Sequence, residues 1–224
     1  MPPTCTSSGE CSFIHHDVAP RSWVSHVAKH LHVDSMVNVA VSGGGNILTF
    51  ETVKFLVQKY NYTSADTAIL LNVTDSVRLD IQCQWHDVDR SQWVKWDQNL
   101  IPWTYKDRSS IAYKQKIVNL SMDEIESQSA AATESLFNFL SNLGFNFRFL
   151  MMRNYFDNRK LRPVIEKFLS QAILLPDGPD MISFCKQHSV VDEDGKHPSN
   201  QGHRLIADHV LKNILLQKTV KTGN

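Results

Sequence analysis

Hydrophobic residues in the first third of the chain switch between helical and strand patterns. Residues 23–31 place apolar side chains at helical spacing, whereas the run 36–41 is short, continuous and ends at the glycine turn 42–45. A second helical pattern covers 47–57, and a continuous apolar run follows at 67–73. The order predicted is helix, strand, glycine turn, helix, and a strand buried on both faces.

An irregular stretch then separates this region from a second regular one. Residues 80–110 hold scattered polar residues and four of the five tryptophans, which predicts an insertion or lid between sheet elements. Its tryptophans either form a platform for sugar rings or, the interpretation we favour, hold the long loop on the core. Further on, we expect an amphipathic helix at 125–143, a strand at 145–152, a helix near 163–172 and a last helix at about 200–217.

Strands that alternate with helices indicate a particular layer architecture. Right-handed crossovers make such strands parallel and place helices on both faces of the sheet. We therefore predict an α/β fold, a three-layer α/β/α sandwich with a mostly parallel central sheet of the flavodoxin-like kind, in one domain over 1–224. Ligands bind beyond the carboxyl ends of such strands. The segment near Ser12, the turn 42–46 and the segment 72–75 each follow a strand, so we expect them to converge.

Charge and composition narrow the choice of partner. Lys plus Arg and Asp plus Glu both total 23, so no net field attracts nucleic acid or an anionic membrane. No stretch approaches the roughly 18 apolar residues of a membrane span, and the N-terminus lacks a signal-peptide pattern. The four cysteines have no C-x-x-C spacing and are expected to be free thiols in a reducing compartment. We expect a soluble protein, cytoplasmic or virion-associated, that acts on a small molecule or neutral polymer.

The sharpest local signal is an aspartate three residues before a histidine, in a polar loop ahead of the last helix. Asp194 can accept the Nδ1 proton of His197, which leaves Nε2 able to take a proton from a nucleophile. Pro198 and Ser199 suit the opening of the following helix. The alternative is an ordinary turn in which Asp194 caps the backbone and His197 is solvated. The spacing indicates an oriented general base.

A nucleophile for that base is predicted at the opposite end of the chain. Ser12, in the segment 9–13, lies ahead of the first predicted helix, where a serine can project from a strand-to-helix turn. A helix-capping role for Ser12, Ser7 or Ser8 is the competing interpretation. Together with Asp194 and His197, the serine completes the residue types of a hydrolytic triad.

In order and spacing, these motifs resemble the conserved blocks of the SGNH (GDSL-like) hydrolase family over nearly the whole chain. The segment 9–13 is similar to the first block, with Cys11 where Asp is usual. The segment 38–43 is similar to the second block, in which an Asn lies five residues before the oxyanion glycine, here Gly43. The segment 71–75 departs from the third block, because Thr74 stands at the usual Asn position. Asp194 and His197 match the last block, and Gly202 is also in keeping with it.

The resemblance implies a serine esterase that uses Ser12, His197 and Asp194 and forms an acyl-enzyme. It also implies an oxyanion hole built from the amides of Ser12 and Gly43, completed by Thr74 or Asn72. Small carboxylic esters, among them acetylated carbohydrates, are the implied substrates. Thr74 and Cys11 keep open a second function, a non-catalytic glycan- or protein-binding member of the same fold.

Metals and cofactors have weaker support. His15 and His16 are adjacent, and no histidine pair shows the i, i+4 spacing with a nearby Glu that is typical of zinc hydrolases. The turn 42–46 suits an anion at a helix start but lacks the Lys-Ser/Thr of a P-loop. We therefore expect neither a metal nor a cofactor, and phosphate binding remains the weakest alternative.

Overall fold

A computed structural model describes residues 4–8, 22–33, 36–38, 45–76, 80–82, 100–102, 120–176, 180–193, 195 and 197–221. The elements in chain order are β1 (Thr4–Ser8), α1 (Trp23–His30), β2 (Met36–Asn38), α2 (Asn46–Lys59), β3 (Ala68–Val73), β4 (Asp80–Gln82), β5 (Leu100–Pro102), α4 (Met122–Asn142), β6 (Asn146–Met151), η4 (Tyr155–Asp157), α5 (Leu161–Lys167), η5 (Leu169–Gln171), α6 (Met181–Gln187) and α7 (Asn200–Lys221). The described helices include none long and apolar enough to cross a membrane.

In the described part of the chain, four parallel strands form the central sheet, in the order β2-β1-β3-β6. Beyond β6, Ala172 makes a parallel bridge to Phe149, and the N–H of Ile173 donates to the Phe149 carbonyl at 2.8 Å. The chain thus begins a fifth parallel position next to β6. All described strands of this sheet point the same way, so their carboxyl ends share one edge.

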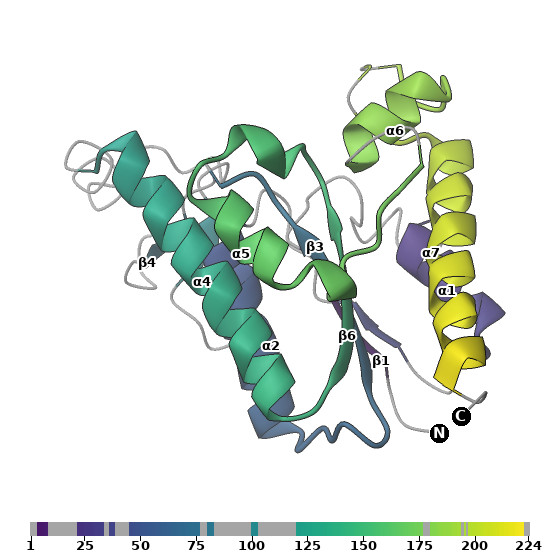
Figure 1. The fold of residues 1–224 in the computed structure, drawn as a ribbon, viewed down its shortest axis with the longest axis horizontal. Helices are drawn as coiled ribbons and strands as arrows, with labels where there is room; N and C mark the ends of the chain where they lie inside the picture. The colour runs from purple at the N-terminus through teal and green to yellow at the C-terminus, as the bar shows by residue number, and fades with distance from the viewer. Residues whose placement is uncertain are drawn as a thin grey trace.

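Side-chain alternation along β3 sorts the core into two layers. Ile69, Leu71 and Val73 pack into the cluster that includes residues of α2, α4 and α5. Leu70 packs instead with residues of α1, α6 and α7. Helices therefore cover both faces of the sheet, and Figure 1 shows α1 and α7 on one side and α2, α4 and α5 on the other. This confirms the predicted three-layer α/β/α sandwich with a parallel sheet.

The longest predicted helix forms where its capping signals place it. The Ser121 side chain accepts from the Glu124 N–H while the Glu124 carboxylate accepts from the Ser121 N–H, so α4 begins with a capping box. The hydrogen bonds lower the pKa of the Glu124 carboxyl. Gly144, at φ +72°, takes the left-handed conformation that favours glycine just beyond the helix.

The structure departs from the sequence-based expectations in a few places. The strand expected before Ser12 is present as β1, but it is the polar segment Thr4–Ser8 and it pairs with both β2 and β3 inside the sheet, a place where an apolar run would be expected. Helix α6 carries no strong pattern and is not among the predicted elements. Most of the predicted insertion at 80–110 lies outside the described residues, and its described parts, β4 and β5, pair antiparallel.

Candidate active site

The strands that precede the predicted site residues end side by side. Ser8, the last residue of β1, is in register with Asn72 of β3, and Thr74 follows the end of β3. Ser12, Gly43 and Asp194 lie outside the described residues. Asn72, Thr74 and His197 are described.

The segments that follow Ser12 and His197 meet where α1 and α7 begin. The N–H of Trp23, the first residue of α1, donates to Nδ1 of His203, in the first turn of α7, at 3.3 Å. Both helices contribute to the same core cluster, in which Trp23 and Ile206 are buried. In Figure 1 the two helices lie together along one face. The start of α1 is thus joined to the start of α7, the helix that follows His197 in the chain.

His203 itself is buried and neutral. Its exposed fraction is 2 %, and burial, with a smaller effect from the nearby charge of His26, lowers its pKa to about 4. The neutral ring is the form that offers Nδ1 as a hydrogen-bond acceptor. The role of His203 could not be predicted from the sequence, because nothing local distinguishes it from a surface histidine.

His197 projects from a loop whose backbone is closed on itself. The N–H of Asp192 donates to the His197 carbonyl at 2.7 Å, and the N–H of Gly195 donates to the Asp192 carbonyl at 2.8 Å. Val191 bridges Pro198 in antiparallel fashion. His197 is half-buried. The loop on which the predicted base sits is therefore held by its own hydrogen bonds.

The start of α7 clamps the base of this loop. The Ser199 N–H and hydroxyl both donate to the Val190 carbonyl, at 2.9 and 3.0 Å, and the Ser199 hydroxyl accepts from the Gly202 N–H at 3.2 Å. A Cβ at Gly202 would lie 2.5 Å from that carbonyl oxygen, closer than van der Waals contact allows. Glycine is therefore needed here for the close approach of α7 to the loop.

The end of β3 is held by Asn46, which the motif analysis overlooked. Its Oδ1 accepts from the Thr74 N–H at 2.9 Å, and its Nδ2 donates to the Thr74 carbonyl and to the Ser129 hydroxyl. Asn46 is the first residue of α2, directly after the glycine turn. The predicted phosphate-binding turn thus leads into a residue that fixes the backbone of Thr74.

The two predicted oxyanion donors of β3 differ in how their polar groups are used. The Thr74 side chain is buried, and its hydroxyl makes a long 3.4 Å hydrogen bond to the Asp75 carbonyl. Asn72 is 1 % exposed, and among the described residues neither Nδ2 nor Oδ1 has a hydrogen-bond partner. By strand alternation Asn72 shares the sheet face of Leu70, the face covered by α1 and α7. A buried amide without a partner costs stability and calls for a functional explanation.

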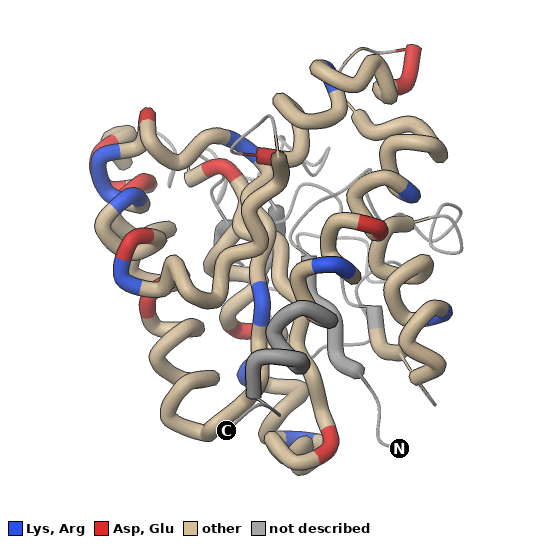
Figure 2. The backbone as a smooth tube through the Cα atoms, turned by 45° about the vertical axis from the view of Figure 1, so that its right-hand side comes forward, with Lys and Arg blue, Asp and Glu red and all other residues tan. Residues whose placement is uncertain are grey.

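Surface charge on the described chain is mixed in sign. Figure 2 shows Lys and Arg interspersed with Asp and Glu along the helices. Ion pairs such as Lys167–Glu134 at 2.7 Å and Lys160–Asp123 at 3.0 Å join α4 to the α5 region. This distribution agrees with the balanced composition.

Comparison with known proteins supplies structural relatives but no sequence relatives. No protein-family model and no curated protein matches the chain. The psychrotrophic esterase EstA from Pseudoalteromonas sp. is similar over 96% of this chain and 98% of its own, at 10% identity and a TM-score of 0.55. The acetylxylan esterase Axe2 from Geobacillus stearothermophilus is similar over 95% of this chain and 94% of its own, at 14% identity and a TM-score of 0.51. LAE5, an alpha/beta hydrolase enzyme from the metagenome of Lake Arreo, is similar over 95% of this chain and 94% of its own, at 12% identity and a TM-score of 0.51. The chain therefore shares the fold of these hydrolytic enzymes, which agrees with the α/β fold predicted from its sequence.

Proposed function

We propose that the protein is a serine esterase in which Ser12 is the nucleophile, His197 the general base and Asp194 the residue that orients the base. The observation that carries the proposal is the buried Trp23–His203 hydrogen bond, which joins the start of α1 to the start of α7. Ser12 lies between β1 and α1 in the chain, and His197 lies three positions before the first residue of α7. A fold that joins these two helix starts favours an encounter between the two side chains.

Chain connectivity adds a limit on distance. Ser12 is four positions after Ser8, and an extended chain spans at most about 3.6 Å per residue, so the two Cα atoms lie within roughly 14 Å of each other. Ser8 is paired with Asn72 at the carboxyl edge of the sheet, where ligands bind in parallel α/β proteins. This limit favours a position for Ser12 near the carboxyl end of β3.

The structural relatives add two supporting facts. EstA was crystallised inhibited by monoethylphosphonate. The catalytic mutants of Axe2 replace an Asp and a His that lie three positions apart, the spacing of Asp194 and His197 here. Both facts concern other proteins, and the spacing of the two catalytic residues in Axe2 favours a catalytic role for Asp194 and His197 here.

The proposed reaction has two balanced steps. Ser12 Oγ attacks the ester carbonyl, its proton passes to His197 Nε2, and the same proton then leaves with the alcohol as the carbonyl C–O bond breaks. Water attacks the acyl-enzyme, gives its proton to His197, and the Ser12 Oγ–carbonyl bond breaks as Oγ regains a proton. The products are one alcohol and one carboxylic acid, and Asp194 stabilises the transient imidazolium.

For the oxyanion we propose that Asn72 donates alongside the amides of Ser12 and Gly43. Thr74 is less suited, since its N–H is bound to Asn46 and its hydroxyl has the Asp75 carbonyl as partner. The Asn72 amide has no partner among the described residues. In a site that excludes water, a donor without another partner stabilises a developing negative charge far more than a donor that already has one.

The experiment that tests the triad uses a fluorophosphonate probe and p-nitrophenyl acetate. Wild type should be labelled and should hydrolyse the ester, whereas Ser12→Ala, His197→Ala and Asp194→Asn should lose activity by factors of about 10³ or more. Asp192→Asn is the matched control, because Asp192 is an exposed aspartate of the same loop, and it should keep full activity. Equal labelling of Ser12→Ala and wild type would refute the assignment, and absence of any labelling would favour the non-catalytic glycan- or protein-binding function.

The oxyanion assignment is tested with Asn72→Leu and Thr74→Val. Asn72→Leu should lower kcat about 10²–10³-fold, because the transition state loses a donor. The same change should raise the free energy of unfolding by about 1–3 kcal/mol, since it removes a buried amide that has no partner among the described residues. Thr74→Val should lower kcat by less than tenfold. A larger loss in Thr74→Val than in Asn72→Leu would assign the donor to Thr74 instead.

A further inference from the structure

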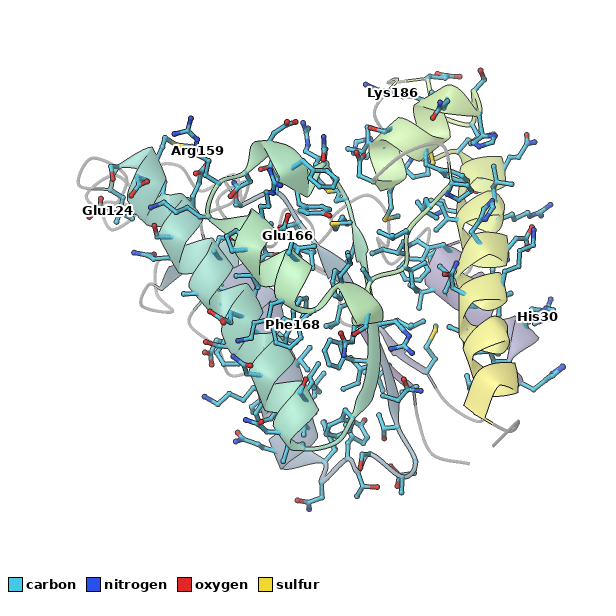
Figure 3. All side chains as sticks on the ribbon, in the orientation of Figure 1. His30, Glu124, Arg159, Glu166, Phe168 and Lys186 are labelled. Carbon is cyan, nitrogen blue, oxygen red and sulfur yellow. The ribbon has the colours of Figure 1, made fainter. Side chains whose placement is uncertain are left out.

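An open cleft of about 430 Å³ begins one residue beyond Thr74. It lies between the ends of β3 and β6, the first turns of α4, the η4 segment and α6. Its charged lining comes from Asp75, Glu126, Arg153, Asp157, Asp180 and Lys186. Lys186, labelled in Figure 3, marks α6 at the upper end of the molecule. The volume is in the range of small-molecule sites, about 300–1,000 Å³.

The chemistry of the lining excludes an apolar occupant. Of the ten described residues that line it, Ile182 is the one with an aliphatic side chain. A fatty acyl chain placed here would strip water from the carboxylates and amides and return no hydrogen bonds. The cleft therefore suits a hydrated, polar group.

The charges of the lining also disfavour an anion. Four carboxylates face the cleft against two cations. Arg153 is engaged with Asp75, its Nε lying 3.5 Å from the carboxylate oxygen. Ionised carboxylates only accept hydrogen bonds, so the occupant must supply donors. A group rich in hydroxyls meets this need without carrying charge.

Some polar side chains of the cleft are held by hydrogen bonds within the protein, whereas another is available to bind a ligand. The Asp180 carboxylate, 3 % exposed, accepts from the N–H and hydroxyl of Ser183, and Asn158 Oδ1 accepts from the Leu161 N–H at 2.8 Å. These bonds fix the walls. The half-buried Glu126 carboxylate makes no hydrogen bond or ion pair to any described residue. It is the acceptor best able to bind a ligand hydroxyl.

We propose that this cleft binds the alcohol portion of the ester, and that this portion is a neutral, hydroxyl-rich group such as a sugar. The assignment of the cleft to the leaving alcohol rests on the proposed esterase activity, because the cleft adjoins the proposed oxyanion residues of β3. The sugar-binding property itself stands on the lining alone. Glu126 is its principal hydrogen-bond acceptor.

The binding test measures the binding of glucose and of glucuronate to the full chain by ligand-observed NMR. Glucose should bind, glucuronate at least tenfold more weakly, and Glu126→Gln should weaken glucose binding about tenfold, the effect of one charge-assisted hydrogen bond. Glu134→Gln is the matched control, a carboxylate two turns further along α4 that pairs with Lys167 outside the cleft, and it should bind as wild type does. Equal binding of glucose and glucuronate, or no binding of glucose, overturns the inference.

A kinetic test separates this inference from the esterase proposal. Wild type should show a higher kcat/KM for glucose monoacetate than for butyl acetate. In Glu126→Gln, kcat/KM for glucose monoacetate should fall about tenfold relative to kcat/KM for p-nitrophenyl acetate. Hydrolysis of p-nitrophenyl acetate with no preference for the sugar ester refutes the cleft assignment and leaves the esterase standing. Glucose binding that depends on Glu126 in a protein that hydrolyses no ester supports the sugar site and refutes the esterase.

Discussion

Acidification should destabilise this protein through His203, the histidine that joins α1 to α7. Its folded-state pKa of about 4 lies below the ordinary value of 6.5, so the native state favours the neutral ring. The stabilisation is fully present above pH 6.5 and is lost as the pH falls toward 4, because the unfolded chain takes up the proton first. One pKa unit corresponds to about 1.4 kcal/mol. The difference between the ordinary pKa of 6.5 and the folded-state pKa of about 4 therefore corresponds to roughly 3 kcal/mol of unfolding free energy.

That loss is large against the total stability of a domain, about 5–15 kcal/mol. It has a structural cause that a substitution can isolate. Protonation turns Nδ1 from an acceptor into a donor facing the Trp23 N–H. His203→Asn places an oxygen near the same position, where it can accept that N–H without titrating.

The assay is urea unfolding of wild type and His203→Asn at several pH values between 7 and 4. Wild type should lose about 3 kcal/mol more than the variant over this range. His32→Asn is the control, because His32 is exposed and its left-handed backbone, at φ 51°, is well tolerated by asparagine. Its pH dependence should follow wild type. Parallel curves for wild type and His203→Asn would refute the reasoning.

Other substitutions probe the supports of the site. Gly202→Ala should lower stability by about 1–3 kcal/mol and reduce esterase activity, because its Cβ would meet the Val190 carbonyl at 2.5 Å; an unchanged melting temperature would contradict this. Asn46→Ala should cost about 1–3 kcal/mol in urea unfolding, since the buried Thr74 N–H loses its acceptor, and wild-type stability would argue against that role. Burial, aided by the charge of Asp180, raises the pKa of Cys185 to about 12, so peptide mass spectrometry should find it alkylated at pH 8 only after unfolding; rapid native alkylation would show the thiol to be accessible.

Local patterns in the sequence determined the regular helices and strands and the fold class. Helix α4 is readable because its periodicity, its capping box and the glycine after it are all encoded within one segment. Strand β3 is a continuous apolar run, as expected for a strand covered on both faces. The Asp-x-x-His spacing ahead of α7 likewise lies within six residues of the helix start. Such features depend on neighbouring residues alone.

Other features depend on residues that are distant in the chain, and only the tertiary structure decided them. The polar segment β1 is an inner strand because its backbone pairs with both β2 and β3. The pattern of its side chains does not predict this inner position. Asn46 holds Thr74 and Ser129 across separations of 28 and 83 residues, and His203 holds Trp23 across 180. That the Asn72 amide has no hydrogen-bond partner among the described residues is likewise a property of its surroundings. Hydrogen bonds between distant segments form only after the chain has packed, so the residues that make them carry no local signature.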